Sequence, residues 1–539
     1  MFFAFDGFLL RISSILLVCF YRRIDEHLTM SLEEYFLPFR KNVIGQNLSH
    51  NINGNTLDII YADWTASGRL YQPIENYLSN ELGPYVANTH TETNLTGSAM
   101  TNAYHDAQHI IKRHVNACEN DVLITAGAGM TAVVNKFQRI LGLRIPERMQ
   151  EQVQFSESER PVVFITHMEH HSNQTSWYEC DVTLEIVDPD SNGLPSLEHL
   201  EVLLEKYQDR KVKIGSFSAC SNVTGIKTPY YQLAEIMHKH GGLCFVDFAA
   251  SAPYVDIDMH PSNPKQALDA IYFSPHKFLG GPGSSGVLVF NKVLYKNKVP
   301  DHPGGGTVTW TNPWGKHSFF NNIEMREDGG TPGFLQCIKT ALAIKLKDAM
   351  GVENIHQREA EITHYVMDTL AKNDQVVMLE PNIRDRLAIV SFYVRGAHHN
   401  LIVRLLNDKF GVQTRGGCSC AGTYGHILLN VDQDTSSKIT EQIDSGDFAE
   451  KPGWIRASFH PTTSDKEVTF VVDAINKVTE NLAAWSKEYR FNPATGDYEH
   501  YSLSVEFPNL SEFNPLSSEE RAASVKTVEN PSILRKLFG

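Results

Sequence analysis

The chain has 539 residues, which is long for one ordinary domain and enough for a large core with a smaller second domain. Its hydrophobic content of 42% and charged content of 21% are typical of a globular chain rather than a disordered or fibrous one. A net charge of −15 without a long basic run argues against nucleic-acid binding, so small molecules are the expected ligands.

The cysteines and the N-terminus bear on location. Eight cysteines are scattered without the spacing of a disulfide framework, which favours a reducing compartment such as the cytoplasm. Residues 8–21 are apolar apart from Arg11, Ser13 and Ser14, a span shorter than the ~18 residues of a transmembrane helix. We expect residues 1–29 to be a membrane anchor, an organelle signal or a non-native extension. If they are a non-native extension, Met30 is the natural start. We predict a cytoplasmic protein, with a membrane-anchored or organellar one as the alternative if residues 1–29 are genuine.

The first half of the chain alternates strands, polar loops and helices. Strand-like residues 57–61 precede a turn-rich loop at 63–69, a helix is expected at 73–82 and an amphipathic helix at 103–117. The strand at 121–125 is followed by Gly127, Ala128 and Gly129 and then by a helix. A small-residue turn at a helix N-terminus presents free N–H groups, which bind phosphate, although a simple packing turn has the same sequence.

Two further strands end in polar residues. The strand at 161–166 leads to His170 and His171, which would point to opposite faces if the strand continued, so only one of them can face a site. The strand at 213–218 leads to Asn222, and a helix is expected at 230–240. The repeated order of strand, loop and helix predicts a mostly parallel sheet whose ligands bind at the carboxyl ends of its strands.

The centre of the sequence is a lysine between two short apolar runs. Lys277 follows the strand 270–273 and precedes the glycine turn 280–283, and the chain returns as a strand at 287–290. Thirty residues earlier, a buried-type strand delivers Asp247 at its end. In pyridoxal phosphate enzymes a carboxylate pairs with the pyridine nitrogen and a lysine carries the aldehyde as a Schiff base. We therefore predict pyridoxal phosphate as cofactor, with Ser274 and His276 near its phosphate.

The second half predicts a smaller α+β domain. Glycine-rich loops at 303–308 and 326–333 precede helices at 334–350 and 352–372, a strand at 386–392 and a helix at 399–410. Arg456 lies in a short strand, and a buried arginine commonly clamps a carboxylate. The expected boundaries are 30–333 for the large domain, 334–485 for the small domain and 486–539 for a C-terminal extension, in which the sequence indicates no chemistry.

These motifs together resemble the class V aminotransferase-fold enzymes, which include cysteine desulfurases and selenocysteine lyases, over about residues 61–483. The resemblance implies an aspartate-aminotransferase-like fold (fold type I) and a homodimer with shared active sites. It also implies that His170 stacks on the cofactor and relays protons, that Asn222 binds the phenolic oxygen, and that Arg456 holds the substrate α-carboxylate. Thr331 would reach the phosphate in the neighbouring subunit.

The resemblance also gives the loop 413–426 a role. Desulfurases carry their sulfur-accepting cysteine here, a few residues after an arginine, and Cys420 after Arg415 matches this spacing best. Arg415 is also expected to bind the substrate. The pair Cys418 and Cys420 could form half of a metal site, but no second Cys or His pair has the usual spacing, so no metal is predicted.

The predicted reaction is therefore desulfuration of an amino acid through Lys277 and a persulfide on Cys420, with a sulfur acceptor protein as a partner. Two features depart from the desulfurase pattern: Ala250 stands where a glutamine is common, and the loop has a doubled cysteine. The alternatives are an aminotransferase or other chemistry at the α- or β-carbon of an amino acid, and a non-catalytic protein with this fold.

Overall fold

The computed structural model describes residues 30–52, 55–89, 91–153, 155–503, 505 and 507–516. The expectations for residues 1–29 and for the end of the C-terminal extension lie outside these residues. Within the described part of the chain, no helix is both long enough and apolar enough to cross a bilayer.

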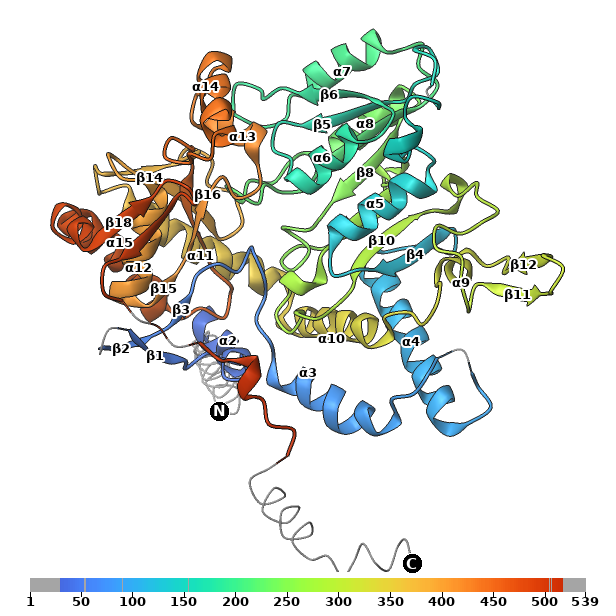
Figure 1. Ribbon diagram of the computed structural model, residues 1–539, viewed down its shortest axis with the longest axis horizontal. Helices are drawn as coiled ribbons and strands as arrows, with labels where there is room; N and C mark the ends of the chain where they lie inside the picture. The colour runs from blue at the N-terminus through green and yellow to red at the C-terminus, as the bar shows by residue number, and fades with distance from the viewer. Residues whose placement is uncertain are drawn as a thin grey trace, which may run out of the picture.

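A seven-stranded sheet with helices on both faces forms the large domain (Figure 1). Its strand order is β4-β10-β9-β8-β7-β5-β6, and only β10 runs antiparallel to its neighbours. The strands are β4 (Asp121–Ala126), β5 (Val162–Thr166), β6 (Thr183–Val187), β7 (Lys213–Ser218), β8 (Leu243–Asp247), β9 (Ala270–Phe273) and β10 (Gly286–Asn291). The predicted mostly parallel α/β sheet is confirmed.

The central strands are buried on both faces: every residue of β5, β7 and β9 is buried, and most residues of β5 and β9 are apolar. In β5, Val162 and Phe164 belong to one hydrophobic core, and Val163 and Ile165 belong to the core on the other face. The first core is covered by α4 (Leu95–His114), α7 (Leu197–Lys206), α8 (Tyr230–Lys239) and α10 (Phe334–Met350). The second is covered by α5 (Met130–Ile140) and α6 (His171–Tyr178).

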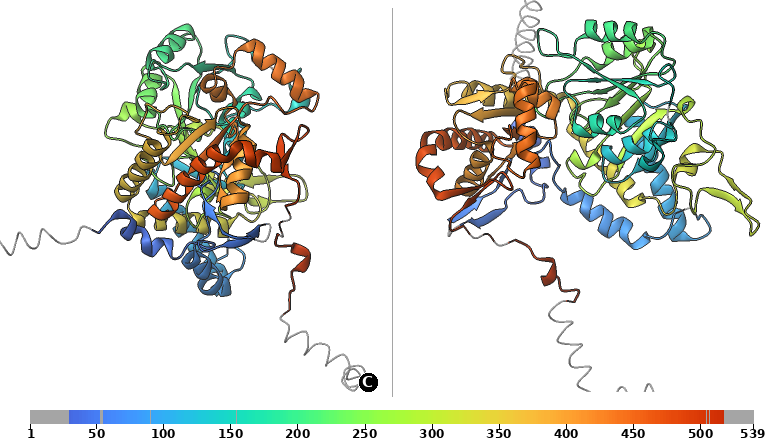
Figure 2. Two further views of the ribbon diagram at one scale, coloured as in Figure 1. Left: turned by 90° about the vertical axis from the view of Figure 1, so that its left-hand side faces the viewer. Right: turned by 45° about the horizontal axis from the view of Figure 1, so that its top comes forward.

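The small domain is α+β, as expected. Its antiparallel sheet has the order β13-β14-β17-β16, with strands β13 (Val376–Met378), β14 (Ile389–Val394), β17 (Trp454–Ser458) and β16 (Arg415–Gly417). Its helices are α11 (Val352–Leu370), α12 (His399–Phe410), α13 (Gly422–Leu428), α14 (Gln433–Asp444) and α15 (Asp465–Trp485). The two domains stand side by side in Figure 1, and the right-hand view of Figure 2 shows the same arrangement.

The N-terminal segment packs on both domains. It comprises α2 (Leu32–Arg40), β1 (Ser49–Ile52), β2 (Asn55–Asp58), β3 (Ile60–Tyr61) and α3 (Gln72–Asn76). β3 pairs in parallel with β15 (Val412–Gln413) of the small domain, whereas Ile74 of α3 packs against Leu279 beside the large sheet. The segment therefore joins the two domains near the start of the turn-rich loop at 63–69.

Several elements differ from the sequence expectations. α4 begins at Leu95 rather than at residue 103, because Asn94 caps it by accepting a hydrogen bond from the Gly97 amide, and its polar first turns hide the helical period. Residues Cys337 and Ile344 of α10 lie in the first core of the large domain, although the expected boundary at 333 placed that helix in the small domain.

The sequence also did not predict three peripheral groups of elements. They are the hairpin β11 (Val308–Thr311) and β12 (His317–Phe319) with α9 (Ile323–Glu327), the edge strand β6 with α7, and the C-terminal hairpin β18 (Tyr489–Asn492) and β19 (Asp497–His500). The last hairpin packs on the small domain, where Tyr489 belongs to its core.

Candidate active site

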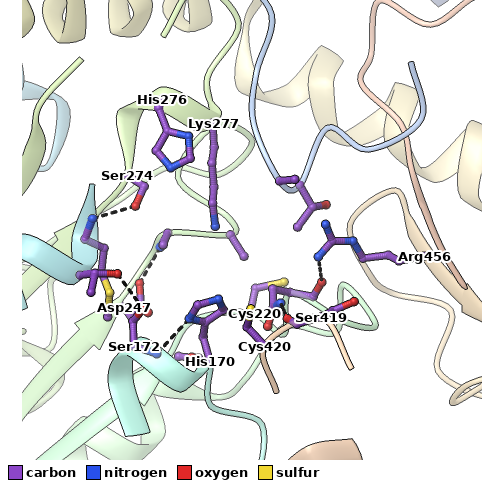
Figure 3. A pocket seen from close by; sticks show the side chains of 18 of the residues that line it. His170, Ser172, Cys220, Asp247, Ser274, His276, Lys277, Ser419, Cys420 and Arg456 are labelled. Carbon is purple, nitrogen blue, oxygen red and sulfur yellow. Dashed lines mark hydrogen bonds between the residues drawn. The ribbon is translucent and has the colours of Figure 1, made fainter. Parts of the chain in front are cut away.

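The carboxyl ends of β5, β7, β8 and β9 meet at one edge of the large sheet, and a pocket opens there toward the small domain (Figure 3). Asp247 is the last residue of β8, and Lys277 ends the short turn Pro275–Lys277 after β9. His170, Ser274, His276, Arg415, Cys420 and Arg456 line the same pocket. The structure thus brings together residues as distant in the sequence as His170 and Arg456, which are 286 positions apart.

Lys277 and Asp247 carry opposite charges and line the same pocket, and each affects the pKa of the other. The surrounding protein desolvates the amine and lowers the pKa of Lys277, and the Asp247 carboxylate partly offsets this shift. Burial raises the pKa of Asp247, while a hydrogen bond from the Ala249 amide to Oδ1 (2.8 Å) and the charge of Lys277 act in the opposite direction. A cationic ring nitrogen placed beside Asp247 would favour the ionised carboxylate further.

His170 caps the N-terminus of α6. Its Nδ1 accepts a hydrogen bond from the Ser172 amide at 3.0 Å, so the proton of the neutral ring lies on Nε2. Burial and the nearby positive charges, chiefly that of Lys277, lower the pKa of His170 to about 3. The ring is therefore neutral at physiological pH and offers one N–H donor.

The expected strand position of the two histidines is wrong, because β5 ends at Thr166 and both residues belong to the start of α6. Only His170 lines the pocket. His171 instead contacts the cysteine loop: its Nε2 accepts from the Gly422 amide (2.9 Å) and its own amide donates to the Cys420 carbonyl (2.7 Å).

The N-terminus of α5 and the turn after β9 form the polar end of the pocket. The Met130 amide donates to Ser274 Oγ over 2.8 Å, and a Cβ added at Gly129 would lie 3.1 Å from the same oxygen. Gly129 therefore leaves room where the helix end approaches Ser274. Gly127 and Ala128 line an adjoining cavity together with His276.

Two hydroxyls in this region were not predicted from the sequence. Thr131 and Ser172 line the pocket, and their oxygens are 2.6 Å apart. Thr131 lies two positions beyond Gly129, in the first turn of α5. A hydroxyl residue just after a small-residue turn, at the start of a helix, is the sequence signal that could have identified it. Cys220 and Ser218, at the end of β7, also line the pocket and were not predicted.

Arg456 and Asn222 connect the pocket to the small domain. Arg456 donates from Nη1 to the Asn222 carbonyl (3.0 Å) and from Nη2 to Asp63 Oδ1 (2.6 Å). The Asn222 amide group donates to the Ser419 carbonyl (2.7 Å). Among the described residues, Arg456 Nε and Asn222 Oδ1 are buried without a hydrogen-bond partner, so Nε can donate a bond to a ligand and Oδ1 can accept one.

The structure separates the two loop cysteines. Cys420 lines the pocket, whereas Cys418 packs against an apolar cluster that includes Met168 and Tyr424. Arg415 Nη2 lies 4.0 Å from Cys420 Sγ, and Cys420 has a positive φ of 58°. The hydrogen bonds from His171 and Asn222 hold this loop against the large domain.

Thr331 lies apart from these residues. It is exposed and does not line the pocket of its own chain. Its expected role at the site of a second subunit stays a prediction.

Comparison with known proteins agrees with this architecture. The model of the family described as Aminotransferase class-V matches residues 60–471. The chain is 27% identical over 378 residues to the "Probable cysteine desulfurase" of Halalkalibacterium halodurans, covering 69% of this chain and 86% of that protein. It is 28% identical over 373 residues to a protein of the same description from Staphylococcus epidermidis, covering 68% and 84%.

Solved structures show the same fold. A cysteine desulfurase from Thermococcus onnurineus NA1 superposes with a TM-score of 0.66 at 21% identity, covering 82% of this chain and 98% of that chain. One from Escherichia coli gives a TM-score of 0.61 at 20% identity, covering 78% and 94%. Pyridoxal phosphate is in general the cofactor of such enzymes. The family model matches well over half of the chain, and the chain therefore belongs to the aminotransferase class-V family.

Proposed function

We propose that this protein is a pyridoxal phosphate enzyme that removes sulfur from L-cysteine, forming alanine and a persulfide on Cys420. The observation that carries this proposal is the position of Cys420, which lines the same pocket as Lys277 and Asp247 while Cys418 packs elsewhere. An enzyme that only moved the α-proton would need Lys277 but no thiol at this place.

The residues of the pocket fit the cofactor. The N-terminus of α5, with Thr131 and Ser274, suits a phosphate, and the neutral His276 adds a ring N–H. Burial and the charge of Lys277 lower the pKa of His276 to about 4. Asp247 suits a protonated pyridine nitrogen, Asn222 is the match for a phenolic oxygen, and Lys277 is the amine available for covalent attachment. When bound, pyridoxal phosphate withdraws electrons from the α-carbon of an attached amino acid.

The protein groups then divide the remaining work. Arg456 holds the α-carboxylate of the substrate through its guanidinium, and Lys277 Nζ, with its lowered pKa, accepts and returns the α-proton. Cys420 Sγ attacks the substrate sulfur as a thiolate, and the Arg415 guanidinium lies 4.0 Å from it. The bond between Cβ and sulfur breaks with its electron pair on carbon, and that carbon takes a proton before alanine leaves.

Two further proposals follow from this reaction. The sulfur on Cys420 must leave to a thiol, so a small thiol or a sulfur acceptor protein completes the turnover. We also propose a homodimer in which Thr331, exposed on its own subunit, contributes to the neighbouring site.

A second candidate is transamination or other α- or β-carbon chemistry on a different amino acid. Ala250 lines the pocket, and its methyl group offers no hydrogen bond where desulfurases commonly have a glutamine. A catalytically inactive protein is the third reading, and Lys277 and Asp247 in one pocket argue against it.

The test compares wild type with Cys420→Ser and Cys418→Ser, each incubated with L-cysteine and dithiothreitol and assayed for sulfide and alanine. Wild type and Cys418→Ser should release both products in equal amounts, and Cys420→Ser should release almost none while keeping its bound cofactor. Equal alanine from all three would remove Cys420 from the mechanism. Absence of sulfide from wild type would favour the second candidate.

A further inference from the structure

Three side chains with metal-ligating atoms meet at the end of β4 that lies away from the pocket. Cys118 precedes β4, Asp121 is its first residue, and His260 comes from the loop between β8 and β9. One ligand atom from each lies within 4.8 Å of the other two. β4 runs toward the pocket at Ala126, so this cluster is about 17 Å away at ~3.4 Å per residue.

Asp121 is the buried centre of the cluster. Its Oδ2 accepts from the Cys118 amide (2.7 Å) and pairs with His260 Nε2 (2.6 Å). Its side chain is 0% exposed, and Oδ1 has no hydrogen-bond partner among the described residues. A buried carboxylate oxygen without a partner is costly, and a cation beside it would remove that cost.

The surrounding chain holds the three residues in place. The His260 amide donates to Asp258 Oδ1 (2.9 Å), which also accepts from Asn116 Nδ2 (2.7 Å). The Met259 amide donates to the Val115 carbonyl over 3.1 Å. These bonds tie the loop of His260 to the turn of Cys118, so the ligands are positioned before any ion arrives.

We propose that Cys118, Asp121 and His260 bind a divalent cation of the zinc class. Thiolate, imidazole and carboxylate are the ligands that zinc takes, and three of them leave a fourth, open position. Cys118 is exposed and the side chain of His260 is 33% exposed, so an ion can enter from solvent.

Binding requires a defined movement of protons. The hydrogen bond between His260 Nε2 and Asp121 Oδ2 gives way to the metal on Nε2, so the neutral ring carries its proton on Nδ1 instead. The Cys118 thiol releases its proton to solvent, and the Asp121 carboxylate joins the ion through Oδ1, the oxygen without a partner among the described residues. Affinity must therefore fall in acid. Because the cluster lies at the opposite edge of the sheet from Lys277, the ion cross-links the α4–β4 turn to the loop of His260 and takes no part in the chemistry.

The sequence could not indicate this site. Cys118 and Asp121 have a metal-like spacing, but a lone Cys-x-x-Asp is common, and His260 is 139 positions from Asp121. Only the return of the chain after β8 brings the imidazole beside the carboxylate.

The test uses the holoenzyme after treatment with a chelator. Equilibrium dialysis against zinc, with metal measured by atomic spectroscopy, should give one zinc per chain, and zinc should slow alkylation of Cys118 as read by peptide mass spectrometry. Cys118→Ser and His260→Gln should weaken binding by at least ~10-fold, since loss of an outer partner of a ligand already costs 10- to 100-fold.

Two control variants locate the ion. His199→Gln removes a histidine of similar exposure that lies 3.4 Å from Asp188 and belongs to no metal-ligand cluster among the described residues, and it should bind zinc normally. Cys420→Ser should also bind normally. The proposal is overturned by binding that survives both Cys118→Ser and His260→Gln, by equal alkylation of Cys118 with and without zinc, or by loss of binding in Cys420→Ser.

Discussion

The guanidinium of Arg456 donates to Asp63 Oδ1 over 2.6 Å, and the two residues are 393 positions apart in the chain. The charge of Arg456 is thus already balanced before a substrate binds, and Nη1 is engaged by the Asn222 carbonyl. Nε is without a partner among the described residues, so it is available to a substrate carboxylate. That carboxylate would bind a guanidinium that Asp63 already orients.

We expect Arg456→Lys to raise KM for the amino acid and to lower kcat/KM by roughly 10- to 100-fold. An ammonium cannot bond Asp63, the Asn222 carbonyl and a substrate carboxylate in the geometry of the planar guanidinium, and hydrogen bonds to charged groups contribute about 1.5–3 kcal/mol. Arg386→Lys is the matched control, because Arg386 is equally buried but donates to backbone carbonyls away from the pocket. An unchanged KM in Arg456→Lys would exclude it from substrate binding.

Two buried glutamates should respond differently to amidation. Glu169 accepts from Thr166, Asn173 and Ser218, and all its partners can donate. The amide of Glu169→Gln would place an N–H against the Asn173 donor, so the free energy of unfolding should fall by about 1–3 kcal/mol. Burial raises the pKa of both glutamates, but at Glu169 the bonds from Ser218, Asn173 and Thr166 oppose that shift and favour the carboxylate. The pKa of Glu359 is raised to about 8, so that group is mostly protonated at pH 7 and Glu359→Gln should be nearly neutral. Urea unfolding of both variants measures the contrast, and equal losses would contradict it.

Lys347 should make stability depend on pH. Its Nζ donates to the Ala252 carbonyl (2.8 Å), and burial lowers its pKa from 10.5 to about 7. Between pH 7 and 10.5 the unfolded chain binds more protons than the folded one, so this residue makes the folded state more stable as pH rises. Relative to Lys347→Met, wild type should gain up to about 1.4 kcal/mol per pH unit in this range.

The measurement is denaturant unfolding of both proteins between pH 6 and 9. Lys345→Met, which removes an exposed lysine from the same helix, controls for the loss of a charge. A difference between Lys347→Met and wild type that stays constant with pH would show that Lys347 keeps its ordinary pKa in the fold.

The contact between His171 and the cysteine loop should control the accessibility of Cys420. His171→Ala removes the acceptor of the Gly422 amide, a bond of about 1 kcal/mol, so iodoacetamide should alkylate Cys420 about five times faster. Desulfuration should slow while bound cofactor is unchanged. His109→Ala, an exposed position on α4, is the control, and equal alkylation rates in both variants would mean that other contacts fix the loop.

Much of the architecture could be predicted because β5, β7, β8 and β9 are apolar runs with polar residues directly after them. Parallel strands bring those ends together, which is why Asp247 and Lys277 could be placed at one edge from sequence alone. α10 and α12 were expected with the bounds that the structure shows, since both have clear helical periods.

Other features depend on contacts that no local pattern records. The partnership of Asp63 with Arg456 and the anchoring of the cysteine loop by His171 join segments from opposite ends of the chain. The start of α4 was missed because its first turns are polar, and β6 because only the last residue of that edge strand, Val187, is buried. Tertiary packing decided these elements, rather than propensity.

The order of strands in the small domain has a consequence for synthesis. β17, which carries Arg456, lies between β14 and β16 and so must be inserted after both of its neighbours have been made. At about 5–20 residues per second, the ribosome needs roughly 25–90 seconds to reach it. Until then β14 and β16 present unpaired edges and the pocket lacks one wall, so nascent chains and fragments that end before residue 454 are exposed to aggregation and cannot bind substrate.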